Sequence, residues 1–128
     1  MIDFTGRTAV VTGGTDGIGA ATALRLYRHG ADVTVIGRSP VKADALVAKA
    51  SATPGPGSLR AVVADFSRMA TVEAVVERTA GEIAGIDLLV HAVGILITRA
   101  EHTGEGIEKD FAVSYLSRFV FQEAAARH

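Results

Sequence analysis

The chain has 128 residues, which is enough for one compact domain and too few for a nucleotide-binding domain joined to a separate substrate domain. Its 13 Lys and Arg residues against 14 Asp and Glu residues give a net charge of -1, so we expect neither nucleic acid nor a membrane as a partner. The chain has no cysteine, which excludes disulfides and thiolate metal sites. We therefore expect no metal site and a cytoplasmic location.

Apolar, β-branched runs alternate with helical patterns along the chain. In chain order we predict a strand at 8–12, a helix at 18–29, a strand at 33–36, a helix from 40 to about 51, a strand at 59–64, a helix at 69–83, a strand at 86–90 and a helix at 106–127. This alternation predicts parallel βαβ units with right-handed crossovers. We therefore expect an α/β fold with a Rossmann-type doubly wound parallel sheet in three layers (α/β/α), as a single domain over residues 1–128.

A glycine-rich segment joins the first predicted strand to the first predicted helix. Glycines at 13, 17 and 19 allow a tight turn and let backbone N–H groups approach a pyrophosphate without obstruction by a Cβ atom. The positive end of the helix then faces the phosphates. The alternative is a glycine-rich turn without a ligand, but the position of the segment inside a βαβ unit favours a dinucleotide.

The spacing Thr12-Gly13-x-x-x-Gly17-Ile18-Gly19 resembles the nucleotide loop of the short-chain dehydrogenase/reductase family, whose members are NAD(P)-dependent oxidoreductases. The similarity continues in order through Gly37-Arg38-Ser39, Asp65, His91-Ala92-Val93-Gly94 and Phe111-Ala112-Val113-Ser114. This resemblance implies hydride transfer between a nicotinamide and a small carbonyl or alcohol substrate. The cofactor contacts that it implies, together with those expected from charge, are Gly13, Thr15, Asp16, Gly17, Ile18, Gly19, Arg38, Ser39, Asp65, Phe66, His91, Ala92, Val93, Gly94 and Val113.

The end of the second predicted strand bears on the choice of dinucleotide. An acidic side chain there would bind the ribose hydroxyls of NAD, but this chain has Gly37. The guanidinium of Arg38 and the hydroxyl of Ser39 suit an additional phosphate, so we expect NADP to be preferred, with NAD possible. Alternatively, Arg38 is a solvated loop cation, and the charge of Asp16 would act against the same phosphate.

By resemblance, the Asp65 carboxylate would accept a hydrogen bond from the adenine amino group, beside the backbone of Phe66, and Val113 would pack near adenine. From the residues alone, Asp65 also suits an Asx turn and Val113 a buried aliphatic position. The family commonly has Asn-Asn-Ala-Gly where this chain has the segment beginning at His91, so both amides are lost. His91 replaces one amide or is a neutral core histidine.

The catalytic residues of the family are missing from the chain. Family members use a Tyr-x-x-x-Lys pair and a preceding Ser, but Tyr27 is followed four residues later by Ala31, and Tyr115 by Phe119. Ser114 stands where the family usually has an asparagine of the proton relay, and it is the single catalytic candidate. Because family chains are about twice this length, we expect the fold to be truncated after the fourth strand and its following helix.

Truncation would leave the edge of the fourth predicted strand bare, and the last predicted helix carries an apolar stripe of Phe111, Tyr115 and Phe119. We therefore expect a homo-oligomer or completion by a further stretch of chain, against the alternative of burial within one subunit. Three functions remain open: an NADP-dependent oxidoreductase, a non-catalytic NADP-binding module or inactive fragment, and another doubly wound class such as a methyltransferase or a flavodoxin-like domain. Methyltransferases favour an acid after the second strand, which this chain lacks.

Overall fold

A computed structural model describes residues 2–128, which divide into two compact units. The first unit comprises the chain up to Val63 together with Ile86–Ala92, and the second comprises Ala64–Gly85 together with Val93–His128. The four strands and the first two helices belong to the first unit, and the remaining helices belong to the second. The prediction of a single domain over residues 1–128 stays a prediction.

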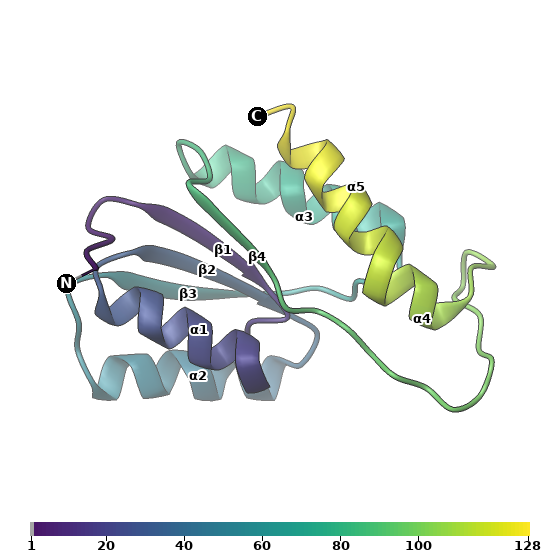
Figure 1. Cartoon of the computed structure of the whole chain (residues 1–128), viewed down its shortest axis with the longest axis horizontal. Coiled ribbons are helices and arrows are strands. Elements are labelled where there is room, and N and C mark those ends of the chain that lie inside the picture. The colour runs from purple at the N-terminus through teal and green to yellow at the C-terminus, as the bar shows by residue number, and fades with distance from the viewer. Residues whose placement is uncertain (1) are drawn as a thin grey trace. The chain divides into compact units, whose positions relative to one another are not determined.

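The first unit is built on a four-stranded parallel sheet with the strand order β3-β2-β1-β4 (Figure 1). This order places the first strand between the second and the fourth, as in one half of a doubly wound Rossmann sheet. The predicted fold class is confirmed. The strands are β1 (Thr8–Thr12), β2 (Asp32–Gly37), β3 (Ser58–Val63) and β4 (Leu88–His91).

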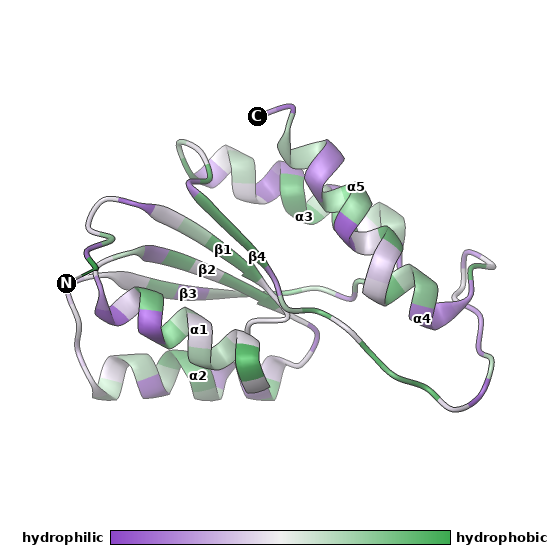
Figure 2. Ribbon diagram, viewed as in Figure 1, coloured by the Kyte–Doolittle hydropathy of each residue, from purple (hydrophilic) through white to green (hydrophobic). Residues whose placement is uncertain are grey.

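Two helices, α1 (Gly17–Arg28) and α2 (Pro40–Ala52), cover one face of this sheet (Figure 1). Because side chains alternate along a strand, Ala9 and Val11 of β1 and Val33 and Val35 of β2 all join the hydrophobic core beneath these helices. Leu24, Leu46 and other apolar residues of the two helices complete that core. The strands are hydrophobic along most of their length, as Figure 2 shows.

The second unit is held together by α3 (Met69–Glu82) and α5 (Ser117–Ala125), which lie side by side (Figure 1). Phe121 of α5 is completely buried, and its ring lies 6.1 Å from that of Phe66, between centroids. A short helix α4 (Lys109–Phe111) and a π-helical segment η1 (Ala112–Leu116) lead into α5. Burial of the Phe121 ring against its neighbours supplies hydrophobic stabilisation to this unit.

Every strand and helix predicted from the sequence is present, with some shifts at the ends. The strand predicted at 86–90 begins instead at Leu88, because the Asp87 carboxylate accepts hydrogen bonds from the N–H of Thr8 and the guanidinium of Arg7. The connection between the helix predicted to end at about 51 and the strand predicted at 59–64 is shorter than expected, since Ala52 belongs to α2 and Ser58 to β3.

The prediction of one regular α-helix over 106–127 was wrong in two respects: the helix starts later, and it contains a π-helical segment. Gly106 has a φ of +78° and belongs to a turn closed by a hydrogen bond from the N–H of Thr103 to the carbonyl of Ile107. The helix begins only at Lys109, where the Glu108 carboxylate accepts hydrogen bonds from two N–H groups of the first turn. It then passes through the π-helical segment and ends at Ala125.

Candidate functional site

The glycine loop between β1 and α1 is tied to the end of the neighbouring strand. The N–H groups of Gly13 and Gly14 donate to the carbonyl oxygen of Ile36, at 2.8 and 3.2 Å. The parallel pairing of Thr12 with Ile36 already brings these two strand ends together. The loop is therefore held against the carboxyl end of β2, where ligands of open parallel sheets bind.

Two glycines allow the loop to lead directly into the helix. Gly17 has a φ of +52°, in the left-handed region where glycine is favoured. At Gly19, a Cβ atom would collide with the carbonyl oxygen of Gly13, so the first turn of α1 lies directly against the loop. No other residue type fits position 19 without a shift of backbone atoms. The loop and the helix start thus form a cradle that side chains do not fill.

The first turn of α1 offers hydrogen-bond donors to a ligand. The Asp16 carboxylate accepts the N–H of Gly17 at 2.9 Å, and the Asp16 carbonyl accepts the N–H of Ala20 at 3.1 Å. Within residues 2–128, the N–H groups of Ile18 and Gly19 have no backbone or side-chain acceptor. Because they lie at the positive end of the helix, these two donors suit the phosphates of a dinucleotide.

The end of β2 lies against the side chain of Thr15. A Cβ atom at Gly37 would collide with the side chain of Thr15, which the glycine loop places there. The next residue, Arg38, is exposed and forms no hydrogen bond or ion pair with the part of the chain that the structure describes. Ser39 caps α2, since its Oγ accepts the N–H of Lys42 at 3.3 Å.

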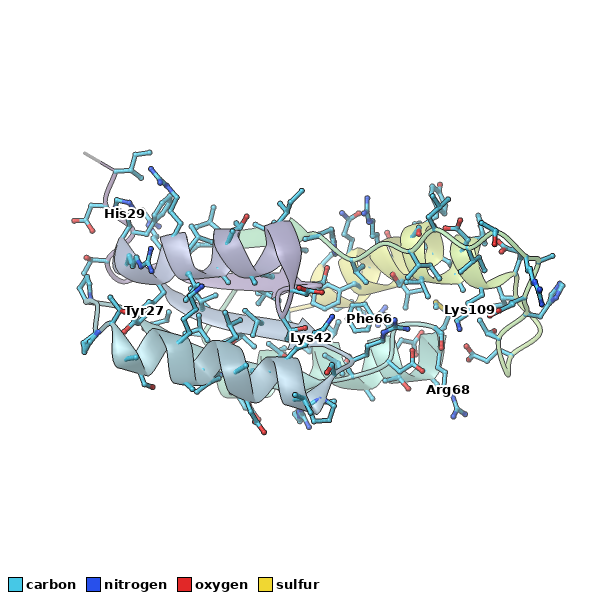
Figure 3. All side chains as sticks on the ribbon, turned by 90° about the horizontal axis from the view of Figure 1, so that it is seen from below. Tyr27, His29, Lys42, Phe66, Arg68 and Lys109 are labelled. Atoms are coloured by element: carbon cyan, nitrogen blue, oxygen red, sulfur yellow. The ribbon has the colours of Figure 1, made fainter. Side chains whose placement is uncertain are left out.

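An ion pair links α2 to the glycine loop. The Nζ of Lys42 lies 2.6 Å from Oδ2 of Asp16, and Figure 3 shows the Lys42 side chain projecting from α2 toward the segment before α1. The hydrogen bond from Lys42, and then that from the N–H of Gly17, lower the pKa of the Asp16 carboxyl group, so this carboxylate stays ionised at neutral pH. Lys42 was not among the site residues predicted from the sequence. Its position in the first turn of the helix after Arg38 was the signal available.

The end of β4 meets the end of β1 through a side-chain hydrogen bond. Nδ1 of His91 lies 3.0 Å from Oγ1 of Thr12, which is fully buried, and the N–H of Ala92 donates to the Thr12 carbonyl at 2.8 Å. The His91 ring is half-buried. These contacts hold His91 and Ala92 beside the end of β1, the strand that leads into the glycine loop.

Other predicted cofactor contacts belong to the second unit. The Asp65 carboxylate accepts the N–H of Ser67 at 2.9 Å, which is the Asx turn considered from the sequence. Phe66 and Val113 are buried. Val93 is half-buried, and its carbonyl accepts a hydrogen bond from the guanidinium of Arg118 at 2.8 Å, a contact not foreseen from the sequence. Gly94 is exposed and, like Val93, follows β4.

The hydroxyl of Ser114 is occupied by the chain itself. It accepts the N–H of Ile95 at 3.1 Å, and it lies 2.8 Å from Oδ1 of Asp110 and 3.2 Å from the carbonyl oxygen of Ile95. A hydroxyl has one proton, so it donates to one of these two oxygens at a time. Ser114 thus fastens the segment after β4 to η1.

Neither tyrosine stands beside a lysine in a catalytic arrangement. The Tyr27 hydroxyl is buried, donates to the carbonyl of Ala50 at 3.2 Å and accepts the N–H of Gly55 at 2.8 Å. Tyr115 is exposed and stacks on Phe111. Within residues 2–128, no cluster of three or more histidine, aspartate or glutamate side chains is placed to hold a metal ion. No helix in the same range combines the length and the hydropathy needed to cross a membrane.

Comparison with known families gives one extensive match. The family model of short chain dehydrogenase matches residues 7–128. A probable oxidoreductase from Streptomyces antibioticus is 39% identical over 119 residues, which cover 92% of this chain and 39% of that protein. The chain therefore spans about two fifths of the length of this curated relative.

Solved structures give the same result. A double mutant of a short-chain dehydrogenase/reductase from Serratia marcescens superposes with a TM-score of 0.83 at 30% identity, covering 99% of this chain and 52% of that chain. A blue fluorescent protein from a metagenomic library, solved in complex with NADPH, superposes with a TM-score of 0.81 at 32% identity. That match covers 98% of this chain and 52% of the other.

Proposed function

The chain belongs to the short-chain dehydrogenase family, and we propose that it forms the cofactor-binding part of an NADP-dependent oxidoreductase. One observation carries this proposal. The cradle at the start of α1, with the free N–H groups of Ile18 and Gly19, lies next to a β2 end that lacks an acid and continues into an exposed arginine. A relative of similar fold was solved with NADPH, which supports the same cofactor here.

Within this proposal, the residues of the first unit have separate tasks. The N–H groups of Ile18 and Gly19 bind the pyrophosphate, and Arg38 binds the phosphate on the adenosine ribose, with the Ser39 hydroxyl as a second donor. The chemistry that a bound dinucleotide would supply here is hydride transfer to or from the carbon of a carbonyl or alcohol substrate. The Tyr-x-x-x-Lys pair does not occur in these 128 residues.

The remaining predicted contacts form part of the same proposal. Asp65 and the backbone of Phe66 would bind adenine beside Val113, while the residues from His91 to Gly94 would approach the nicotinamide side. A homo-oligomer and a cytoplasmic location also stay proposals. The exposed stripe of Phe111, Tyr115 and Phe119 supports the oligomer.

A second candidate is a non-catalytic NADP-binding module. It is favoured by the Ser114 hydroxyl, whose bonds within the chain compete with the water that the family's relay asparagine would hold. Incubating the 128-residue chain with NADPH and a panel of aldehydes and ketones separates the two candidates. NADPH oxidation above background indicates self-contained catalysis, whereas binding without turnover favours the module or a fragment completed by further chain.

Arg38→Ala tests the proposed cofactor preference. Loss of charge-assisted hydrogen bonds to a phosphate should raise the Kd for NADPH by about 10- to 100-fold and leave the Kd for NADH within about threefold. Fluorescence titration of the reduced nicotinamide measures both constants. Arg28→Ala, which removes an exposed arginine at the other end of α1, is the matched control and should change neither constant. Equal effects of Arg38→Ala on both cofactors would refute the assignment of Arg38.

A further inference from the structure

Asp16 brings a negative charge to the proposed cofactor site. The collision that a Cβ at Gly37 would make with Thr15 means that the glycine loop touches the end of β2. Asp16 follows Thr15 and Arg38 follows Gly37, so the acid and the free arginine flank the same contact. An ionised carboxylate here repels a phosphate that Arg38 attracts.

Asp16 nevertheless has a role in the local structure. Its Oδ1 accepts the N–H of Gly17, and Asp16 is the N-cap residue of α1. Such a cap stabilises a helix start, where N–H groups lack intrahelical partners. The lowered pKa of Asp16 keeps the group charged at neutral pH. The cap that favours the helix therefore opposes binding of a doubly charged phosphate nearby.

Lys42 offsets this charge. Its Nζ lies 2.6 Å from Oδ2, the oxygen that Asp16 does not use for capping. The side chains of Lys42 and Asp16 are 54% and 71% exposed, and ion pairs this exposed add little to the stability of a fold. Stabilisation of the fold is therefore not the main effect of this contact.

We propose that Lys42 strengthens the preference for the 2′-phosphorylated dinucleotide by neutralising Asp16 rather than by binding the phosphate itself. Lys42 is engaged with Asp16, whereas Arg38 has no partner in the described part of the chain and is available to the ligand. This inference rests on the proposed function and names a positioning residue for its cofactor site. Lys42 acts on the ligand only through Asp16.

A double-mutant cycle tests the dependence of Lys42 on Asp16. Lys42→Met removes the charge and leaves Asp16 uncompensated, so the ratio of the Kd for NADPH to that for NADH should rise about 3- to 10-fold. Asp16→Asn keeps an oxygen for the cap and removes the carboxylate charge. In the Asp16→Asn background, Lys42→Met should leave the ratio unchanged. Lys49→Met, at the exposed last turn of the same helix, is the matched control and should have no effect.

Fluorescence titration of the full 128-residue chain with NADPH and NADH gives each ratio, and circular dichroism melting checks that each variant folds. If Asp16→Asn does not fold, Asp16→Ser supplies an alternative cap with the same expected result. An equal rise of the ratio in both backgrounds means that Lys42 binds the phosphate directly and overturns the inference. An unchanged ratio in the single Lys42 variant overturns it too, while leaving the proposed function intact. Failure of the unmodified chain to bind either dinucleotide overturns both.

Discussion

Gly19→Ala is expected to abolish NADPH binding, with a rise in Kd of more than about 100-fold, because two charge-assisted hydrogen bonds are lost together. The added Cβ would collide with the Gly13 carbonyl oxygen and lie 2.8 Å from its carbonyl carbon and 3.0 Å from Cα of Gly14. All three are backbone atoms, so no side-chain rotation relieves the collision. The loop must move away from the helix start, and the N–H groups of Ile18 and Gly19 lose their common direction. Fluorescence titration with NADPH measures the loss.

Gly81→Ala is the matched control for this substitution. Gly81 lies in α3, where an added Cβ meets no atom within 4 Å, and the position is exposed. Alanine has the higher helix propensity, so this variant should gain about 0.5–1 kcal/mol of stability and bind NADPH as the unmodified chain does. A folded Gly19→Ala variant with unchanged NADPH affinity would show that the loop is not the phosphate cradle.

Phe121→Ala is expected to lower the free energy of unfolding of the second unit by about 3–5 kcal/mol. Phe121 belongs to α5, which packs against α3, and its side chain has no exposed surface and lies with its ring near that of Phe66. Truncation removes apolar contacts and leaves a cavity that backbone atoms fill only in part. Urea denaturation followed by far-ultraviolet circular dichroism measures the change.

Two variants calibrate this result. Phe119→Ala lies two residues away on the same helix, where the residue is 55% exposed, so in the monomer it should change stability by less than about 0.5 kcal/mol. Phe121→Leu keeps most of the apolar volume and should cost about 1 kcal/mol. Equal losses from the Phe119 and Phe121 substitutions would mean that Phe119 is covered in solution, as in the proposed oligomer.

Much of the fold could be predicted from the sequence because local patterns report local structure. Runs such as Ala9-Val10-Val11 are apolar on both faces of a strand, and Ser39 before Pro40 has the chemistry of a helix start. The glycine spacing from 13 to 19 follows from sterics that act over a few residues. These features depend on the identities of neighbouring residues, so they can be read without knowing which strands pair.

The regularity of the last helix could not be predicted in the same way. Apolar periodicity continues through Gly106, but the turn that contains it and the cap from Glu108 delay the helix start. Glu105 in that turn accepts the N–H of Met69 at 2.7 Å and thereby caps α3, whose preceding residue Arg68 offers no side-chain cap. Met69 and Glu105 are 36 residues apart, so no local sequence pattern indicates their hydrogen bond.

The sequence by itself determined the alternation of strands and helices and the glycine loop, because both depend on the conformational preferences of adjacent residues. It also placed an arginine directly after the second strand. Only the tertiary structure decided that Gly37 excludes a side chain through Thr15 and that Lys42 neutralises Asp16. Those contacts arise when parallel pairing brings the carboxyl ends of β1 and β2 together. Their distances depend on strand register and helix placement, which residue identities along the chain do not specify.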